Sequence, residues 1–202
     1  MANANRPAGF IPVQYLNGAP WNGQARLYSI AAAYATALYI GDPVASSGTA
    51  NAAGVPGIVR GTATGALRGV ILGLGTQEGL IANPQNLDIT YRPGAATAND
   101  WFAMVVDDPM VLFEIQEHAN GTQLVAADIG NNTISFSGTG NGFTSGWQLA
   151  SATDAAPATT ATLQLRLMGL VRRLDNAFGA YAKHLVKINV HELGSGTGAA
   201  GV

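Results

Sequence analysis

The side chains best suited to chemistry in this chain are three histidines, and their spacing does not bring them together. His184 and His191 lie an odd number of positions apart on one predicted strand, so their side chains point to opposite faces. His118 lies on a predicted turn just before Asn120-Gly121. A transition-metal site needs converging histidine and carboxylate ligands. We therefore interpret each histidine as a core or surface residue.

The carboxylates give two further candidate sites. Asp107 and Asp108 precede Pro109, and carboxylates beside turn carbonyls suit calcium. A type I turn containing proline needs no ion, so we favour a turn. Glu114 and Glu117 lie an odd number of positions apart and face opposite ways, which excludes a paired-carboxylate site on that one strand. Carboxylates from different strands remain free to meet.

Motifs for nucleophilic catalysis and for nucleotide binding are missing from the sequence. There is no cysteine, no Gly-x-Ser-x-Gly elbow and no Walker A pattern. The segment GLGTQEG at 73–79 has Glu78 where a dinucleotide fingerprint needs its third glycine, and no helix is predicted after it. We expect no enzyme activity, no metal and no cofactor.

The low content of charged residues is the strongest compositional signal. Only 11% of the 202 residues are charged, against about 25% in typical soluble domains. The formal net charge of −2 argues against binding to nucleic acid or to an anionic membrane. The sequence starts without a secretory signal and contains no apolar run that spans a bilayer, which predicts synthesis in the cytoplasm. A surface so poor in charge favours contact with other subunits.

The elements that position these side chains are predicted to be short strands. Runs rich in β-branched and aromatic residues alternate with Gly, Pro, Asn and Asp turns. This pattern predicts an all-β fold, either a β-barrel or a jelly-roll-like β-sandwich. The apolar runs at 101–106 and 110–117 are predicted to form a hairpin around the turn at 107–109, or to be covered on both faces. A short helical turn is expected at 122–129.

Two strands near the end of the sequence show a two-residue period. Leu163, Leu165 and Leu167 share one face, and the face that carries Gln164 and Arg166 is expected to be wet. In the run at 183–192, Val186, Ile188 and Val190 share a face with His184. Each strand is therefore predicted to bury one side.

The chain divides into three predicted parts: an extended N-terminal arm at 1–25, one β-domain at 26–193 and a flexible Gly-rich tail at 194–202. Three prolines exclude a helix or a central strand in the arm. Its candidate partner contacts are Arg6, Phe10, Tyr15 and Trp21, because aromatic side chains dominate binding energy. An arm folded back on its own domain and an arm docked on a neighbour both remain open.

Four blocks of the sequence resemble decoration (cement) proteins of tailed-bacteriophage heads. They are MANANRPAGFIPVQYLNGAPWNGQARLY at the start, GDPV at 41–44, DDPMVLFEIQE at 107–117 and TATLQLRLMGLVRRLDNAFGAYAKHLVKINVHEL near the end. The first and last blocks are the most specific, because no general strand or turn rule demands their Asn, Pro and Trp placement.

This resemblance implies a structural virion protein that decorates and stabilises the capsid from its outer surface. Its implied partners are the major capsid protein and further copies of itself, with a trimer expected and a dimer as the alternative. The competing interpretation is a phage tail, fibre or receptor-binding β-domain, in which Trp101 and Trp147 would contact sugars. A small hydrolase or isomerase on a β-barrel is a third interpretation, for which the sequence lacks pocket signatures.

Overall fold

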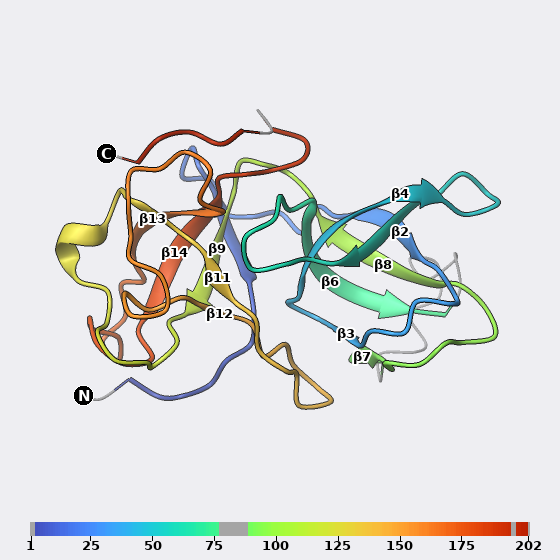
Figure 1. Ribbon diagram of the computed structural model, residues 1–202, viewed down its shortest axis with the longest axis horizontal. Helices are drawn as coiled ribbons and strands as arrows, with labels where there is room; N and C mark the ends of the chain where they lie inside the picture. Colours follow the sequence, from blue (N-terminus) through green and yellow to red (C-terminus); the bar gives the residue numbers. More distant parts are fainter. Residues whose placement is uncertain (1–2, 77–88, 195–196, 202) are drawn as a thin grey trace.

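The computed structural model describes residues 3–76, 89–194 and 197–201, and it confirms the all-β prediction. Two parts lie side by side, a closed barrel and a five-stranded sheet (Figure 1). The described residues contain one helical turn, the 3-10 helix η2 at Ala126–Asp128, within the predicted range. No helix in this part of the chain has the length and apolar character that crossing a bilayer takes.

The barrel is built from the first half of the chain. Its strands close in the order β2 (Arg26–Ile30), β5 (Pro56–Arg60), β4 (Pro43–Ala50), β6 (Gly69–Gly75) and β8 (Trp101–Val106). All pairs are antiparallel except β2 with β5. The short strands β3 (Leu38–Tyr39) and β7 (Tyr91–Arg92) pair beside the barrel. Its interior is filled by an apolar cluster of Tyr28, Ile30, Leu38, Val44, Ile58, Ile71, Leu74, Ala103 and Val105.

The sheet joins the N-terminal segment to the second half of the chain. Its antiparallel order is β1 (Ile11–Tyr15), β9 (Val111–Gln116), β14 (Lys183–Ile188), β13 (Leu165–Leu170) and β10 (Asn132–Thr133). A separate short hairpin pairs β11 (Ser135–Phe136) with β12 (Gln148–Leu149). One face of this sheet is buried in a second apolar cluster that includes Phe10, Phe113, Trp147, Leu167 and Val186.

The second cluster also takes in the outside of the barrel. Leu67, Val70 and Val106 are buried in it, although Val70 and Val106 belong to barrel strands. Side chains alternate between the two faces of a strand, so Ile71 points into the barrel and Val70 points toward the sheet. The second cluster is therefore a core to which both parts contribute, and we call it the shared core.

The structure corrects the predicted hairpin around the turn at 107–109. β8 belongs to the barrel and β9 to the sheet, and they do not pair. The turn carries the chain from one part to the other. Every residue of β9 is buried, so the alternative of an apolar run covered on both faces is the one that holds for β9.

The predicted strand faces are confirmed within β14 and only partly for β13. Beyond the end of β14 the prediction was wrong, because His191 pairs with Leu67 and is buried, whereas Val190 is half-buried. Along β14, buried and half-buried residues alternate, and His184, Val186 and Ile188 face the core. Leu165 and Leu167 are buried as expected. Gln164, expected on a wet face, is fully buried, and its side chain is satisfied by hydrogen bonds with Ser135 in β11 and with Thr62 in the loop after β5.

The two ends of the chain contact the domain more closely than their composition suggests. Residues 11–15 are the edge strand β1, so the extended segment lies on its own domain. Near the other end, the Ala199 amide donates to Asn189, and the Ala199 carbonyl accepts from Asn132 and Arg166. Polar side chains on the sheet thus hold residues 197–201, where the Gly-rich composition predicted a flexible tail.

Candidate contact surface

Phe10 anchors the N-terminal segment in the shared core. Its side chain is 1% exposed, and its ring meets Phe113 edge-on at a centroid distance of 6.0 Å. The Phe10 amide donates to the Gly41 carbonyl at 2.9 Å, where the two backbones cross. A Cβ on Gly9 would lie 2.3 Å from the Gly41 oxygen, so only glycine fits this crossing. Phe10 thus faces inward and is not presented to a partner.

The other predicted contact residues are placed differently from one another. Tyr15 and Trp21 are partly buried against the shared core, and the Tyr15 hydroxyl donates to Asn22 at 2.7 Å. The Trp21 amide donates to the Val13 carbonyl, so residues after β1 fold back along its outer edge. Arg6 is exposed, and its backbone amide donates to the Gln116 side chain at 2.7 Å. The structure does not gather these residues at one site.

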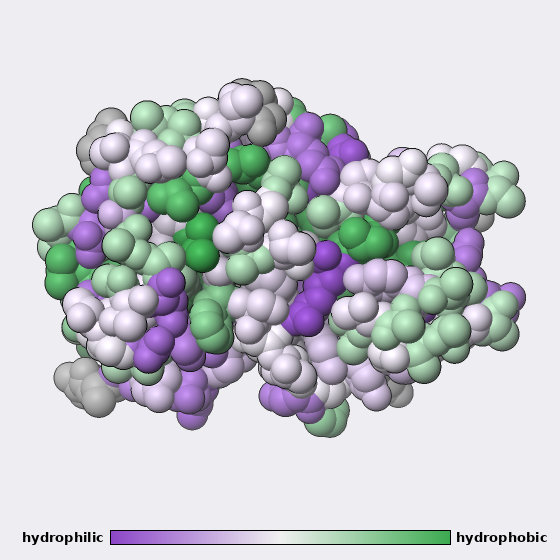
Figure 2. Space-filling view, in the orientation of Figure 1, coloured by the Kyte–Doolittle hydropathy of each residue, from purple (hydrophilic) through white to green (hydrophobic). Residues whose placement is uncertain are grey.

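The exposed apolar side chains of the N-terminal segment are not the ones predicted to be its contact residues. Ile11, Val13 and Leu16 are 41%, 38% and 43% exposed, and Met110 is 50% exposed. The Leu16 amide donates to the Met110 carbonyl, so the two residues are neighbours. We call Ile11, Val13, Leu16 and Met110 the apolar strip. On the face shown in Figure 2, strongly hydrophilic residues form only small, separate groups.

The sheet face opposite the shared core carries cations. Lys187 pairs with Arg166 on one side and Leu112 on the other, and residues paired directly across strands share a face. Glu114 pairs with Leu185, and Lys183 pairs with Gln116, on this same outer face. Among these residues the outer face therefore has three cations and one acid.

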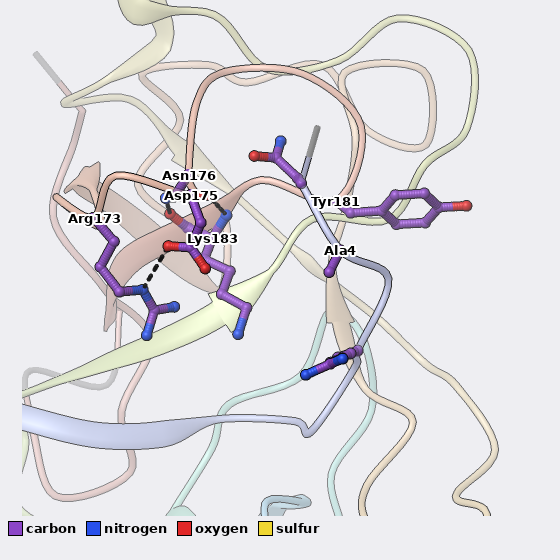
Figure 3. A pocket seen from close by; sticks show the side chains of 8 residues that line it. Ala4, Arg173, Asp175, Asn176, Tyr181 and Lys183 are labelled. Atoms are coloured by element: carbon purple, nitrogen blue, oxygen red, sulfur yellow. Dashed lines mark hydrogen bonds and ion pairs between the residues drawn. The ribbon is translucent and has the colours of Figure 1, made fainter. Parts of the chain in front are cut away.

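A small cavity lies beside the N-terminal segment (Figure 3), and two of the residues that line it, Arg173 and Lys183, contact Glu114 of the outer face. The Glu114 carboxylate is 2.7 Å from the Arg173 guanidinium and 3.4 Å from the Lys183 amine. The cavity has a volume of about 120 Å³. We call it the cationic cavity, and it is lined by Asn3, Ala4, Arg6, Arg173, Asp175, Asn176, Tyr181 and Lys183.

His118, Asp154 and Ser151 meet, but not in the arrangement of a catalytic triad. His118 Nδ1 lies 2.8 Å from Asp154, and the Ser151 hydroxyl donates to the same carboxylate at 2.9 Å. Burial alone would raise the pKa of Asp154, but hydrogen bonds from Asn120, His118 and Ser151 lower it to about 2. The serine bonds the carboxylate instead of the imidazole, so this geometry does not activate a nucleophile.

The other two histidines lie in the interior. His184 Nε2 is 3.0 Å from the Glu117 carboxylate, and both side chains are fully buried. Burial lowers the pKa of His191 to about 4, and its Nδ1 accepts a hydrogen bond from the Leu193 amide. Within residues 3–76, 89–194 and 197–201, no group of three or more histidine or carboxylate side chains is placed to hold a metal ion.

The carboxylates of the turn at 107–109 are occupied by protein donors. Asp107 accepts a hydrogen bond from the Tyr28 hydroxyl at 2.7 Å and lies 3.3 Å from Arg26. Asp108 accepts from the Met110 amide at 2.8 Å, which is a turn-forming contact. These contacts favour the turn interpretation over a calcium loop. The segment at 73–79 lies partly outside the described residues.

The two tryptophans proposed for sugar binding are not open platforms. Trp147 is 1% exposed and lies beneath the Arg60 guanidinium, 5.2 Å from its ring centroid. Trp101 is partly buried and packs against the barrel cluster. Stacking on a sugar needs an exposed aromatic face, so neither residue supports that role in this conformation.

In comparisons with known proteins, no family model, no curated protein and no solved structure matches this chain. The contact surface must therefore be interpreted from its own geometry.

One sequence signal for the cationic cavity was present, because residues 166–187 hold five of the ten Lys and Arg residues and only one acid. The sequence does not show that Arg6 lies beside this segment, since more than 150 residues separate them.

Proposed function

We propose that this chain is a structural virion protein that decorates the outer surface of a bacteriophage capsid. In this role it bridges subunits of the major capsid protein and thereby stabilises the shell. The apolar strip is the observation that carries the proposal, because exposed apolar side chains on and beside β1 are suited to association with another protein. The sequence resemblance supplies the kind of partner.

The low charge of the chain supports the same role. A surface with so few ionised side chains loses little hydration when a neighbour covers it, and aliphatic and aromatic contacts then dominate the interface. The β-sheet fold orders the backbone, so the strands that carry the exposed side chains are in place before binding. Both properties favour a protein that lies on another protein.

The proposed mechanism is multivalent binding by a homo-oligomer, for which we expect a trimer. A single interface of about 1,000 Å² gives modest affinity. An oligomer that contacts several capsid subunits at once raises the effective concentration of each further contact, so its release is slow. The bound copies would then oppose outward displacement of the subunits beneath them.

The test mixes purified protein with undecorated shells and measures co-sedimentation. We expect the double variant Ile11→Thr and Val13→Thr to lose binding, because threonine keeps the β-branched shape and removes apolar contact. Val125→Thr is the matched control, since Val125 is 53% exposed and lies outside the strip. Point changes are preferable to deleting residues 1–25, because the deletion would remove Phe10 from the core.

The proposal fails if the wild-type protein does not bind shells, or if virions labelled for it carry the label on the tail. If the double variant and Val125→Thr bound shells equally well, the apolar strip would not be the contact surface. Light scattering of the isolated protein gives its mass, and a monomer would remove the multivalent mechanism.

A further inference from the structure

We infer that the cationic cavity receives one carboxylate group from a partner protein. The cavity lies between residues 3–6 and the 171–182 loop, beside the outer face of the sheet. This inference depends on the proposed function only for the identity of the partner, which would then be the capsid protein. The chemistry of the site follows from the charges, the space and the fixed walls described below.

The charges of the cavity leave one positive charge uncompensated. Arg6, Arg173 and Lys183 line it, and Glu114 is ion-paired with both Arg173 and Lys183. Asp175 lies 3.9 Å from Arg173. Among the described residues the Arg6 guanidinium has no ion-pair partner. Three cations against two acids match a singly charged carboxylate better than a phosphate, which carries about −1.5 to −2 at neutral pH.

The space and the donors also fit a carboxylate. A volume of about 120 Å³ is several times the roughly 30 Å³ that one water molecule occupies in the liquid, so the cavity has room for a carboxylate. An arginine guanidinium binds a carboxylate through two parallel hydrogen bonds. Figure 3 shows the Arg173 and Lys183 side chains on the same side of the loop, with the Tyr181 ring directed away from them.

The walls of the cavity are held in place without a ligand. The Asn3 side chain donates to the Ala177 and Ala180 carbonyls at 2.8 and 2.9 Å. On the other side, the Asn176 side chain donates to Val171 and Lys183 carbonyls, each at 2.8 Å. These contacts tie the N-terminal segment to the loop, so a ligand meets a formed site and orders few side chains.

The surroundings indicate that the carboxylate belongs to a protein. Leu174 and Phe178, on the same loop, are 98% and 39% exposed, and such apolar side chains suit a protein surface. Residues 166–187 contain five cations and one acid, whereas the rest of the chain contains five cations and eleven acids. The net charge is therefore +4 in this segment and −6 elsewhere, so an acidic surface is steered toward this loop.

The first experiment titrates the full-length protein with sodium acetate and, separately, with sodium chloride and inorganic phosphate at equal ionic strength. Arginine Nε–H signals are followed by NMR. We expect acetate to shift the Arg6 and Arg173 signals saturably and chloride not to. Arg6→Gln should abolish saturation at Arg173, and Arg172→Gln should not. Arg172 is the matched control, because it is an exposed neighbouring cation that does not line the cavity.

The second experiment measures binding of the same variants to undecorated shells. We expect Arg6→Gln to weaken binding about tenfold and Arg172→Gln to change it less than twofold, because a paired charge in an interface is worth more than an exposed one. Thermal unfolding should be the same for both variants, since Arg6 keeps its backbone contact to Gln116.

The outcomes separate this inference from the proposed function. Acetate saturation without shell binding would support the cavity and end the capsid proposal. Shell binding that Arg6→Gln and Arg172→Gln leave equally strong would overturn the cavity and leave the capsid proposal standing. Tighter binding of phosphate than of acetate, or no saturable acetate response, would likewise overturn the assignment to a carboxylate.

Discussion

The barrel and the five-stranded sheet bury their apolar side chains in different ways. The barrel closes on itself, leaves no strand edge free and fills its interior with its own cluster. The sheet is open. Its buried face packs against Leu67, Val70 and Val106, which lie on the outside of the barrel. The sheet therefore depends on the barrel for its core, while the barrel interior does not depend on the sheet.

This difference assigns different tasks to the two parts. The barrel provides a stable support. The sheet packs one face on that support, and its other side carries the exposed apolar side chains of β1 and half-buried cations such as Lys183 and Lys187. Both proposed contact features, the apolar strip and the cationic cavity, lie on the sheet part. Predictions that separate the two parts therefore test the basis of the functional proposals.

The largest expected effect comes from the shared core. Phe113→Ala should lower the free energy of unfolding by about 3–5 kcal/mol, because it removes a fully buried ring from the sheet. Hydrogen exchange should show loss of protection mainly in the sheet. Ile58→Ala, inside the barrel, should instead reduce protection in both parts. Equal losses everywhere in both variants would show that barrel and sheet form one cooperative unit.

The next effect is the pH dependence of stability, which involves two buried groups, Asp42 and His191, near the contact between the barrel and the sheet. Burial raises the pKa of Asp42 to about 6 and lowers the pKa of His191 to about 4. The stability contributed by Asp42 is fully present below about pH 4 and is lost as the pH rises through 6. That contributed by His191 is present above about pH 6.5 and is lost as the pH falls to 4.

These two contributions oppose each other, so variants should reveal them. On acidification from pH 6.5 to 4, His191→Gln should become more stable and Asp42→Asn less stable, each by about 2–3 kcal/mol relative to wild type. Urea unfolding at several pH values measures this difference. If the free energy of unfolding had the same pH dependence in both variants, the pKa values of Asp42 and His191 would not be shifted by burial.

A smaller effect is expected for the polar link between the parts. The buried Gln164 side chain donates to the Thr62 and Gly65 carbonyls and accepts from Ser135. Gln164→Leu leaves these groups without partners and should cost about 1–3 kcal/mol. Gln24→Leu, at an exposed position, is the control and should change stability by less than about 0.5 kcal/mol. Chemical denaturation distinguishes the two.

The smallest effect is expected at the loop that carries the proposed site. Leu174 is 98% exposed, so Leu174→Ser should change the free energy of unfolding by less than about 0.5 kcal/mol. Differential scanning calorimetry tests this. A clear loss of stability would mean that Leu174 packs within the folded protein or between copies of it in solution.

Local patterns in the sequence predicted the kind of elements better than their arrangement. The two-residue period identified the buried face of β14, including His184, because the alternation depends only on backbone geometry. The hairpin prediction for 101–117 was wrong, since an apolar run shows that a strand is covered and not which sheet it joins. That choice is decided by contacts with distant residues such as Val186.

The candidate site was predictable only in part. Arg6 was named from the sequence, and the structure places it at a cavity. Phe10 was named as a contact, but the Gly9–Gly41 crossing turns it into the core. Exposed Ile11 and Val13 could not be told from buried aliphatic residues, because exposure on an edge strand depends on how the segments fold around it. Gln164 looked wet because its partners are far away in sequence.

The strand order also determines when each strand can pair while the chain is being synthesised on the ribosome. All barrel strands have been made by residue 106, whereas β1 waits for β9, and the sheet waits for β14, which begins more than 170 residues after β1. At about 5–20 residues per second, that delay is roughly 10 to 30 s. In the later part of this delay, after residue 106 has been made, the nascent chain carries unpaired apolar side chains beside a complete set of barrel strands. The outer barrel residues Val70 and Val106 are then available to pack against the strands still to be made.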